Sequence, residues 1–301
     1  MNRPPTVVVG LGELLWDCFP DRKLPGGAPA NVAFHAGQLG LRGVICSRVG
    51  EDDLGREMLR FVDDHGLTTD FVQLDPRHAT GRVDIVTDAE GEPRYTFADD
   101  VAWDHLEFDE AWRGLAGEVG AVCFGTLAQR SEPSRQAIHQ FLAAAPAHAL
   151  KVYDVNLRKP WYEAAWIERS LHAADVVKLN GDEVVLLSKL LGLSSADPAD
   201  LAETLRRRFN VGLLCITRGK NGCLLINAFD SIEEEGVPVA DAHPVGAGDS
   251  FTASLIFAQL RKWPLDRCAA FANQVAAKVA SKPGAMPQLS DEFAQLVDRF
   301  A

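Results

Sequence analysis

The chain has 301 residues, 47% of them hydrophobic, and a formal net charge of −12 at pH 7. This length allows one large core, or a core with a small accessory unit. The acidic balance argues against a nucleic-acid protein, because phosphate contacts need a basic surface. No apolar run reaches the length of a membrane span, and the first residues lack a signal-peptide pattern, so we expect a cytoplasmic protein without membrane partners.

Short apolar runs alternate with amphipathic segments along the whole chain. We expect strands at 7–12, 44–49, 121–124, 152–155, 176–179, 213–217 and 223–227. We expect helices at 30–38, 54–65, 134–144, 161–173, 182–191, 199–209 and 251–260. This alternation predicts an α/β fold, a three-layer sandwich whose mostly parallel central sheet carries helices on both faces.

One segment breaks the alternation. The runs 82–86 and 94–97 flank the turn-forming residues 88–93, which predicts a hairpin rather than a crossover. Together with the strand-like stretch 14–19, the hairpin can form a small second sheet. We therefore expect a single domain over 1–301, with a lid of inserted strands from about 14–20 and 80–102.

The six cysteines are scattered, without a Cys-x-x-Cys motif, and no histidines are paired at zinc-binding spacing. Reduced thiols, rather than a disulfide framework or a metal site, are the expectation for such a chain.

The most informative motif runs from Pro244 to Asp249, immediately before an apolar helical segment. The small residues Gly246, Ala247 and Gly248 let successive backbone N–H groups converge at a helix N-terminus, which suits a phosphate or a developing anion. The charge of Asp249 would repel phosphate, so this carboxylate is better placed to accept a proton from an attacking hydroxyl. The alternative is a glycine-rich turn with Asp249 as a helix cap.

Further polar or glycine-rich clusters recur in order at 26–33, 154–158, 180–183 and 217–222. Each follows an apolar run or opens a helix. In open α/β sheets, ligands bind at the carboxyl ends of the strands, where most of these clusters fall.

Two other nucleotide-binding motifs are incomplete. Gly10 and Gly12 begin a Gly-x-Gly-x-x-Gly pattern, but Leu15 occupies its third glycine position, which argues against a Rossmann dehydrogenase. A P-loop enzyme would need Gly-Lys-Ser or Gly-Lys-Thr after a glycine-rich loop, and neither occurs in the sequence.

With these clusters in this order, the chain resembles the ribokinase-like (PfkB) family of carbohydrate kinases from about residue 6 to about residue 290. The motifs at 12–17, 26–31 and 125–128 look most like those of bacterial fructokinases. The resemblance implies an enzyme that uses ATP and Mg²⁺ to phosphorylate a primary hydroxyl of a small sugar. It also implies a β lid, which in many members mediates dimerisation, so a homodimer is possible.

The resemblance assigns catalytic roles to residues of two clusters. Asp249 would be the base, the amides of 246–249 would hold the transferring phosphoryl group, and Arg158 would stabilise its charge. On the sugar side, Asp17, Gly27 and Asn31 would bind hydroxyls, with Phe97 as an apolar contact from the lid. Asp17 could instead be an exposed strand residue, and Phe97 part of the core of the lid.

The nucleotide side is assigned in the same way. The resemblance places Asn180 and Glu183 at magnesium and the triphosphate, with Glu183 acting on the metal through water. It places Thr217, Gly219, Gly222 and Asn273 beside the nucleotide. The alternatives are a helix cap for Asn180 and a plain β-hairpin for 217–222.

One departure from the family pattern concerns a monovalent cation. Family members usually have Asp-Thr before the Val-Gly-Ala-Gly-Asp run, and this chain has His243-Pro244. That aspartate helps to hold potassium in many relatives, so potassium activation is in doubt here, with Asp241 close in sequence.

For the substrate we expect D-fructose, converted to fructose 6-phosphate. The alternatives are 2-keto-3-deoxygluconate, for whose carboxylate Arg82, Arg94 and Arg158 are candidates, and a ribokinase-type substrate. A sugar- or nucleotide-binding sensor that lost catalysis is a further alternative. Retention of Asp249, the glycines and Arg158 argues against it, because binding alone needs no base.

Overall fold

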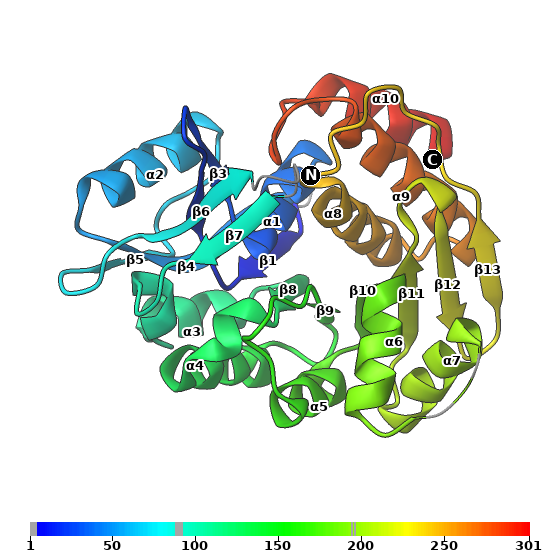
Figure 1. The fold of residues 1–301 in the computed structure, drawn as a ribbon. Coiled ribbons are helices and arrows are strands. Elements are labelled where there is room, and N and C mark those ends of the chain that lie inside the picture. The colour runs from blue at the N-terminus through cyan, green and yellow to red at the C-terminus, as the bar shows by residue number, and fades with distance from the viewer. Residues whose placement is uncertain (1–4, 88–92, 194, 196) are drawn as a thin grey trace.

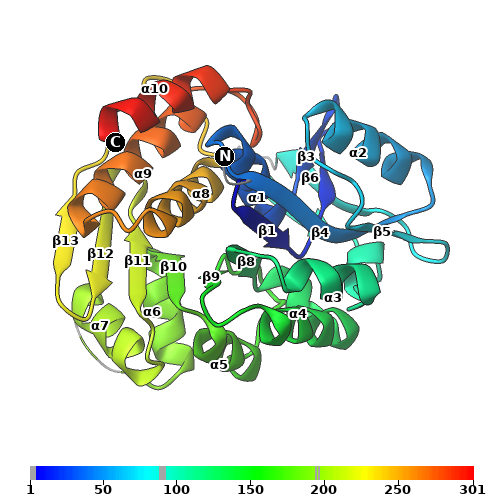
Figure 2. The same ribbon diagram turned by 180° about the vertical axis from the view of Figure 1, so that it is seen from behind.

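The computed structural model describes residues 5–87, 93–193, 195 and 197–301 (Figures 1 and 2). Its large sheet is made of β1 (Val7–Leu11), β4 (Arg42–Gly50), β5 (Val72–Asp75), β8 (Ala121–Gly125), β9 (Leu150–Asp154), β10 (Val176–Asn180), β11 (Leu213–Thr217), β12 (Cys223–Asn227) and β13 (Ser231–Glu234). The strand order is β13-β12-β11-β10-β9-β8-β1-β4-β5. All neighbours from β11 to β5 are parallel, and β12 and β13 are antiparallel at one edge.

The parallel strands are buried on both faces, which explains their nearly continuous apolar sequences. In the centre of the sheet, Val9 of β1 is in register with Val44 of β4 and with Val122 of β8. Further along, Asn180 at the end of β10 is in register with Thr217 at the end of β11. The carboxyl ends of neighbouring strands therefore meet at one edge, as the sequence pattern predicts.

Helices cover both faces of this sheet, so the predicted three-layer sandwich is confirmed (Figure 1). One face carries α1 (Ala28–Gln38), α8 (Ala247–Leu260), α9 (Leu265–Ala280) and α10 (Ser290–Phe300). The other carries α3 (Glu110–Ala116), α4 (Glu132–Ala144), α5 (Ala164–Ala173), α6 (Gly181–Leu190) and α7 (Pro198–Arg208). Near β4, α2 (Asp53–Asp64) packs in a cluster shared with α1. Short 3₁₀ turns are η1 (Ala102–His105), η2 (Leu127–Arg130) and η3 (Gly219–Asn221).

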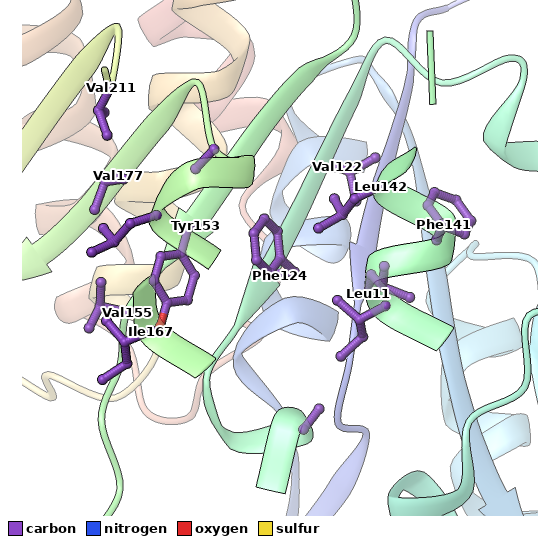
Figure 3. Packing of buried hydrophobic residues seen from close by; sticks show 14 of the residues in the cluster. Leu11, Val122, Phe124, Phe141, Leu142, Tyr153, Val155, Ile167, Val177 and Val211 are labelled. Carbon is purple, nitrogen blue, oxygen red and sulfur yellow. The ribbon is translucent and has the colours of Figure 1, made fainter. Parts of the chain in front are cut away.

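Figure 3 shows part of the core on the α3–α7 face, with Phe124 and Tyr153 among its buried side chains. Phe124 of β8 stacks on Tyr153 of β9 with ring centroids 5.2 Å apart. The Tyr153 hydroxyl lies 2.6 Å from Thr126 Oγ1, and Thr126 Oγ1 donates to the carbonyl oxygen of Val155 at 2.5 Å. Because Val155 directly precedes residues 156–158, this buried network fixes the start of the loop that carries Arg158.

The small second sheet is confirmed and has four strands. They are β2 (Leu15–Cys18), β3 (Lys23–Gly26), β6 (Gly81–Thr87) and β7 (Pro93–Phe97), in the order β3-β2-β6-β7. The predicted hairpin is the antiparallel pair β6–β7, and its turn at 88–92 lies outside the described residues. The pair β2–β6 is parallel, so this sheet is joined across two distant parts of the chain.

Some boundaries differ from the expectation. The helix expected from 161 begins only at Ala164, because Trp161 closes a turn on the carbonyl oxygen of Arg158 and packs against Phe97. Among the described residues, no helix is both long and apolar enough to cross a membrane.

Candidate active site

The first turn of α8 is the centre of the site. Gly246 is the N-cap of this helix with φ 80°, and a Cβ there would lie 2.5 Å from the carbonyl oxygen of Ala285, so the position requires glycine. The amide of Ala247 donates to the carbonyl oxygen of Pro244 at 3.2 Å. The amides of Gly248 and Asp249 belong to the first turn, whose N–H groups have no partner within the helix. An anion can bind there, where the helix dipole is positive.

Asp249 lies on the same turn and is held by a residue from the opposite end of the chain. Asn31, in the first turns of α1, donates from Nδ2 to Asp249 Oδ2 at 2.6 Å. Burial and then the nearby charge of Asp154 raise the pKa of Asp249 to about 6, against the opposing effects of Asn31, Lys178 and Arg158. A carboxylate with this pKa is ionised near neutrality and able to accept a proton.

A second acidic group lies on the side of the site formed by β2 and α1. Burial raises the pKa of Asp17 to about 6, while the charge of Arg158 lowers it and that of Asp249 raises it. Gly27, the N-cap of α1, has φ 112°, and a Cβ there would lie 2.3 Å from the backbone oxygen of Glu13. The three sugar-side residues named from the sequence, Asp17, Gly27 and Asn31, therefore lie together beside Asp249.

Glu13 is a further acidic residue at this place, and the sequence reasoning gave it no role. It is buried, and one carboxylate oxygen has no hydrogen-bond partner within the described part of the chain. Burial raises its pKa to about 7, opposed by hydrogen bonds from its own backbone and from that of Ala28 and by the charge of Arg158. The sequence feature that could have indicated this residue is a glutamate directly after Gly12, at the end of a strand.

Lys178 is the second residue that the sequence reasoning missed. Its Nζ lies 3.1 and 3.2 Å from the two carboxylate oxygens of Asp154, and both side chains are buried. Burial alone would lower the pKa of Lys178, but the charges of Asp154, Asp249 and Glu183 raise it above its usual value. A Cβ on Gly248 would lie 3.1 Å from Lys178 Nζ, which places this cation against the first turn of α8. The sequence feature that could have indicated Lys178 is a charged residue inside an otherwise apolar strand.

Arg158 is exposed and follows the end of β9. Its charge acts on three carboxyl groups, because it lowers the pKa of Glu13, of Asp17 and of Asp249. Phe97 of β7 packs edge-on against Trp161, three residues after Arg158, with ring centroids 5.1 Å apart. The small sheet therefore contacts the loop that carries Arg158.

Asn180 and Glu183 form a capping box at the start of α6. Asn180 Oδ1 accepts from the amide of Glu183 at 2.9 Å, and Glu183 Oε2 accepts from the amide of Asn180 at 2.8 Å. Glu183 Oε1 accepts from the amide of Leu157 at 2.8 Å and so ties α6 to the Arg158 loop. Each carboxylate oxygen of Glu183 therefore has one lone pair left. That lone pair suits a hydrogen bond from a water molecule of a hydrated metal ion better than direct ligation of the metal.

Four of the six residues assigned to the nucleotide side line one cavity of about 270 Å³, and Asn180 and Glu183 are not among its lining residues. Thr217, Gly219 and Gly222 come from the hairpin between β11 and β12, so that segment is a hairpin and also a cavity wall. Asn273 of α9 lies on the other side and donates from Nδ2 to the carbonyl oxygen of Glu235 at 3.0 Å. The cavity extends to Ala247 and Gly248, and therefore to the first turn of α8.

At the position where the family pattern has an aspartate, the backbone amide of His243 donates to the carbonyl oxygen of Ala280 at 2.8 Å. His243 and Asp241 are both exposed. The residues at this turn thus supply no buried carboxylate for a monovalent cation, and we assign no role to potassium.

Comparison with known proteins identifies the family of the chain and its fold. The model of the pfkB family carbohydrate kinases matches residues 12–292. A fructokinase from Salmonella typhimurium is 31% identical over 258 residues, which cover 82% of each chain. The crystal structure of an uncharacterized sugar kinase from Pyrococcus horikoshii is 28% identical, with a TM-score of 0.85 and coverage of 98% of this chain and 100% of that one. A structure of the same archaeal kinase in complex with ATP has a TM-score of 0.83 at 27% identity and covers 97% of this chain and 99% of that one.

The match to the family model and to the fructokinase relative identifies a carbohydrate kinase. The chain belongs to the pfkB family of carbohydrate kinases.

Proposed function

We propose that the protein is an ATP- and Mg²⁺-dependent kinase that phosphorylates the 6-hydroxyl of D-fructose. The observation that carries the proposal is the position of Asp249, between the sugar-side group of Asp17 and Asn31 and the cavity that ends at Gly248. A base between an acceptor site and an anion-binding turn is what transfer of a phosphoryl group to a hydroxyl requires. The ATP complex of the archaeal relative supports the choice of donor, and the fructokinase from Salmonella supports the choice of sugar.

In this mechanism the fructose hydroxyl attacks the γ-phosphorus in line with the leaving oxygen. The new O–P bond forms as the bond to the β-phosphate oxygen breaks, and the hydroxyl proton passes to Asp249. The amides of the first turn of α8, with Arg158 and Lys178, stabilise charge on the transferred group. Asp17, Gly27 and Asn31 hold the sugar hydroxyls, and Phe97 contributes an apolar contact from the small sheet, which acts as a lid.

On the donor side, Thr217, Gly219, Gly222 and Asn273 line the space for the nucleotide. Asn180 and Glu183 would hold the hydrated magnesium ion, whose contribution when bound is to neutralise phosphate charge. Each Glu183 oxygen already accepts one backbone N–H, so the role proposed for it is through water.

A keto acid is the second candidate substrate, because one cation is exposed beside the sugar-side carboxylate. Arg158 is exposed and lowers the pKa of Asp17. Arg82 of the small sheet lies 3.6 Å from Asp84 and is already in an ion pair. Among the three candidates Arg82, Arg94 and Arg158, we propose Arg158 as the partner for the carboxylate of a substrate such as 2-keto-3-deoxygluconate, because its charge acts on Asp17.

The substrate is tested with a coupled ADP-release assay on fructose, 2-keto-3-deoxygluconate, ribose and adenosine, each with and without potassium. We expect turnover on fructose and the same rate in both salts. Preference for the keto acid would replace fructose with the second candidate. Sugar binding without turnover on any of them would favour a sensor.

We further propose that the protein is a homodimer through the small sheet. Val86 and Tyr95 of β6 and β7 are large hydrophobic residues that are 49% and 57% exposed. Measurement of the molecular mass in solution over a range of protein concentrations tests the dimer. We expect Tyr95→Ser to favour the monomer. A wild-type protein that stays monomeric at every concentration would exclude the dimer.

A further inference from the structure

Two histidines and an aspartate form a cluster away from the candidate active site. His78 lies between β5 and β6, Asp100 follows β7, and His105 ends η1. One nitrogen of each imidazole and one carboxylate oxygen of Asp100 all lie within 4.8 Å of one another. His105 Nε2 is 2.8 Å from Asp100 Oδ1, and His78 Nε2 is 3.9 Å from the same oxygen. The two imidazole rings stack with centroids 3.6 Å apart.

A buried carboxylate orients one of these histidines. His78 Nδ1 is 3.0 Å from Asp75 Oδ2, and Asp75 is 1% exposed. Arg48 Nε lies 2.9 Å from the same Asp75 oxygen, so the carboxylate is held ionised between two partners. An ionised acceptor at Nδ1 fixes the proton there and leaves the lone pair on Nε2, which faces Asp100. This carboxylate–histidine arrangement is the one that orients and strengthens metal-binding imidazoles.

The cluster joins the two chain segments that connect the small sheet to the large one. The amide of Ala102 donates to the carbonyl oxygen of Ala79 at 2.8 Å, so the segment entering β6 and the segment leaving β7 run side by side. Asp100 has φ 53°, a left-handed conformation that non-glycine residues seldom adopt outside special turns. This conformation brings its carboxylate to the two imidazoles.

We propose that His78, Asp100 and His105 form a binding site for a transition-metal dication of the zinc class. Two imidazoles and one carboxylate are a common zinc ligand set, with water completing four-coordination. Zinc bonds of about 2.0–2.1 Å place tetrahedral ligand atoms about 3.3 Å apart. His105 Nε2 and Asp100 Oδ1, now 2.8 Å apart, must therefore separate, and His78 Nε2 must approach the same oxygen from 3.9 Å. The two stacked rings must also tilt apart, so that both imidazole lone pairs point to one ion. The side chains of Asp100 and His105 are 77% and 28% exposed, so both can move without disturbing the core. A bound ion would cross-link the two connecting segments.

The site is tested by titration of the nucleotide-free protein with Co²⁺, whose visible absorption reports tetrahedral nitrogen and oxygen ligation, followed by displacement with Zn²⁺. We expect one equivalent to bind, and His78→Gln and Asp100→Asn each to weaken binding at least about tenfold. The matched control is His148→Gln, an exposed histidine outside the cluster, which should leave the titration unchanged.

Absence of saturable Co²⁺ absorption in the wild type, or equal affinity in the wild type and Asp100→Asn, would overturn the site and leave the cluster as a packing contact. If His78→Gln does not fold, Asp100→Asn still tests the metal site. This variant should fold, because asparagine tolerates the left-handed conformation and the Asp100 side chain is exposed. The titration needs neither sugar nor ATP, so its outcome is independent of the proposed kinase reaction.

Discussion

Substitution of Lys178 by methionine separates a structural from a catalytic role for this buried cation. Methionine has a similar length but no charge, so Asp154, which is 2% exposed, would lose its ionic partner. Removal of one partner of a buried pair costs about 3–5 kcal/mol of unfolding free energy. Asp154→Asn in the same chain removes the stranded charge, and its amide oxygen can still accept from Thr252 Oγ1, 2.9 Å away. The double variant should therefore recover most of the lost stability.

Turnover should not follow the same course. Lys178 Nζ lies against the first turn of α8, where its charge can stabilise the transferred group, and loss of such a donor costs about 10²–10³ in kcat. We expect that loss in Lys178→Met and an equal loss in Lys178→Met with Asp154→Asn. Urea denaturation and the coupled assay measure the two quantities on the same three proteins. Recovery of turnover together with stability in the double variant would refute a catalytic role and leave Lys178 as a counter-ion of Asp154.

Three other predictions concern the same site. Because the pKa of Asp249 is about 6, this base is protonated at lower pH, and kcat/KM should fall about tenfold per pH unit below 6; a profile flat to about pH 5 would exclude it as the base. Glu183→Gln loses one of the two carboxylate oxygens that accept from the amides of Leu157 and Asn180. The magnesium concentration for half-maximal rate should therefore rise about tenfold, while the KM for sugar stays the same. An unchanged magnesium requirement would contradict the role assigned to Glu183. Gly246→Ala should lower the unfolding free energy by about 1–3 kcal/mol, because φ is 80° and the added methyl meets backbone; an unchanged urea midpoint would show that this turn accommodates a side chain.

Much of the fold could be predicted because buried parallel strands have nearly continuous apolar sequences. β1 and β11, for example, fall within one residue of the expected ranges. β13 was not predicted, because Ser231–Glu234 is a polar edge strand. β3 was not predicted either, since it is short and contains Pro25.

Part of the candidate site was predicted from local sequence, and residues such as Asp17, Asn31 and Asn273 were named from the family resemblance. The residues of 246–249 and 217–222 were found because glycine turns at strand and helix ends have a recognisable pattern. Lys178 was missed because its importance depends on Asp154, a partner on the neighbouring strand. His78 and His105 were missed for the same reason, since only the fold brings them into contact.

Asp249→Asn should also change stability, in a direction that follows from its pKa. The folded-state pKa of about 6 lies above the usual value of 3.8 for an aspartate, so this group favours the folded state most at low pH, and the benefit is lost as the pH rises through 6. Above pH 6 the ionised carboxylate then costs on the order of 3 kcal/mol. Asp249→Asn removes that cost, so the variant should be the more stable protein at pH 7.5.

The most direct test of the kinase mechanism is therefore turnover of Asp249→Asn, measured beside its binding of fructose by calorimetry. If Asp249 is the base, the variant should bind fructose with a Kd within a few-fold of the wild type and lose about 10²–10⁴ in kcat. Asp241→Asn, an exposed aspartate in the preceding segment, is the matched control and should keep full activity. Near wild-type turnover in Asp249→Asn would contradict the mechanism.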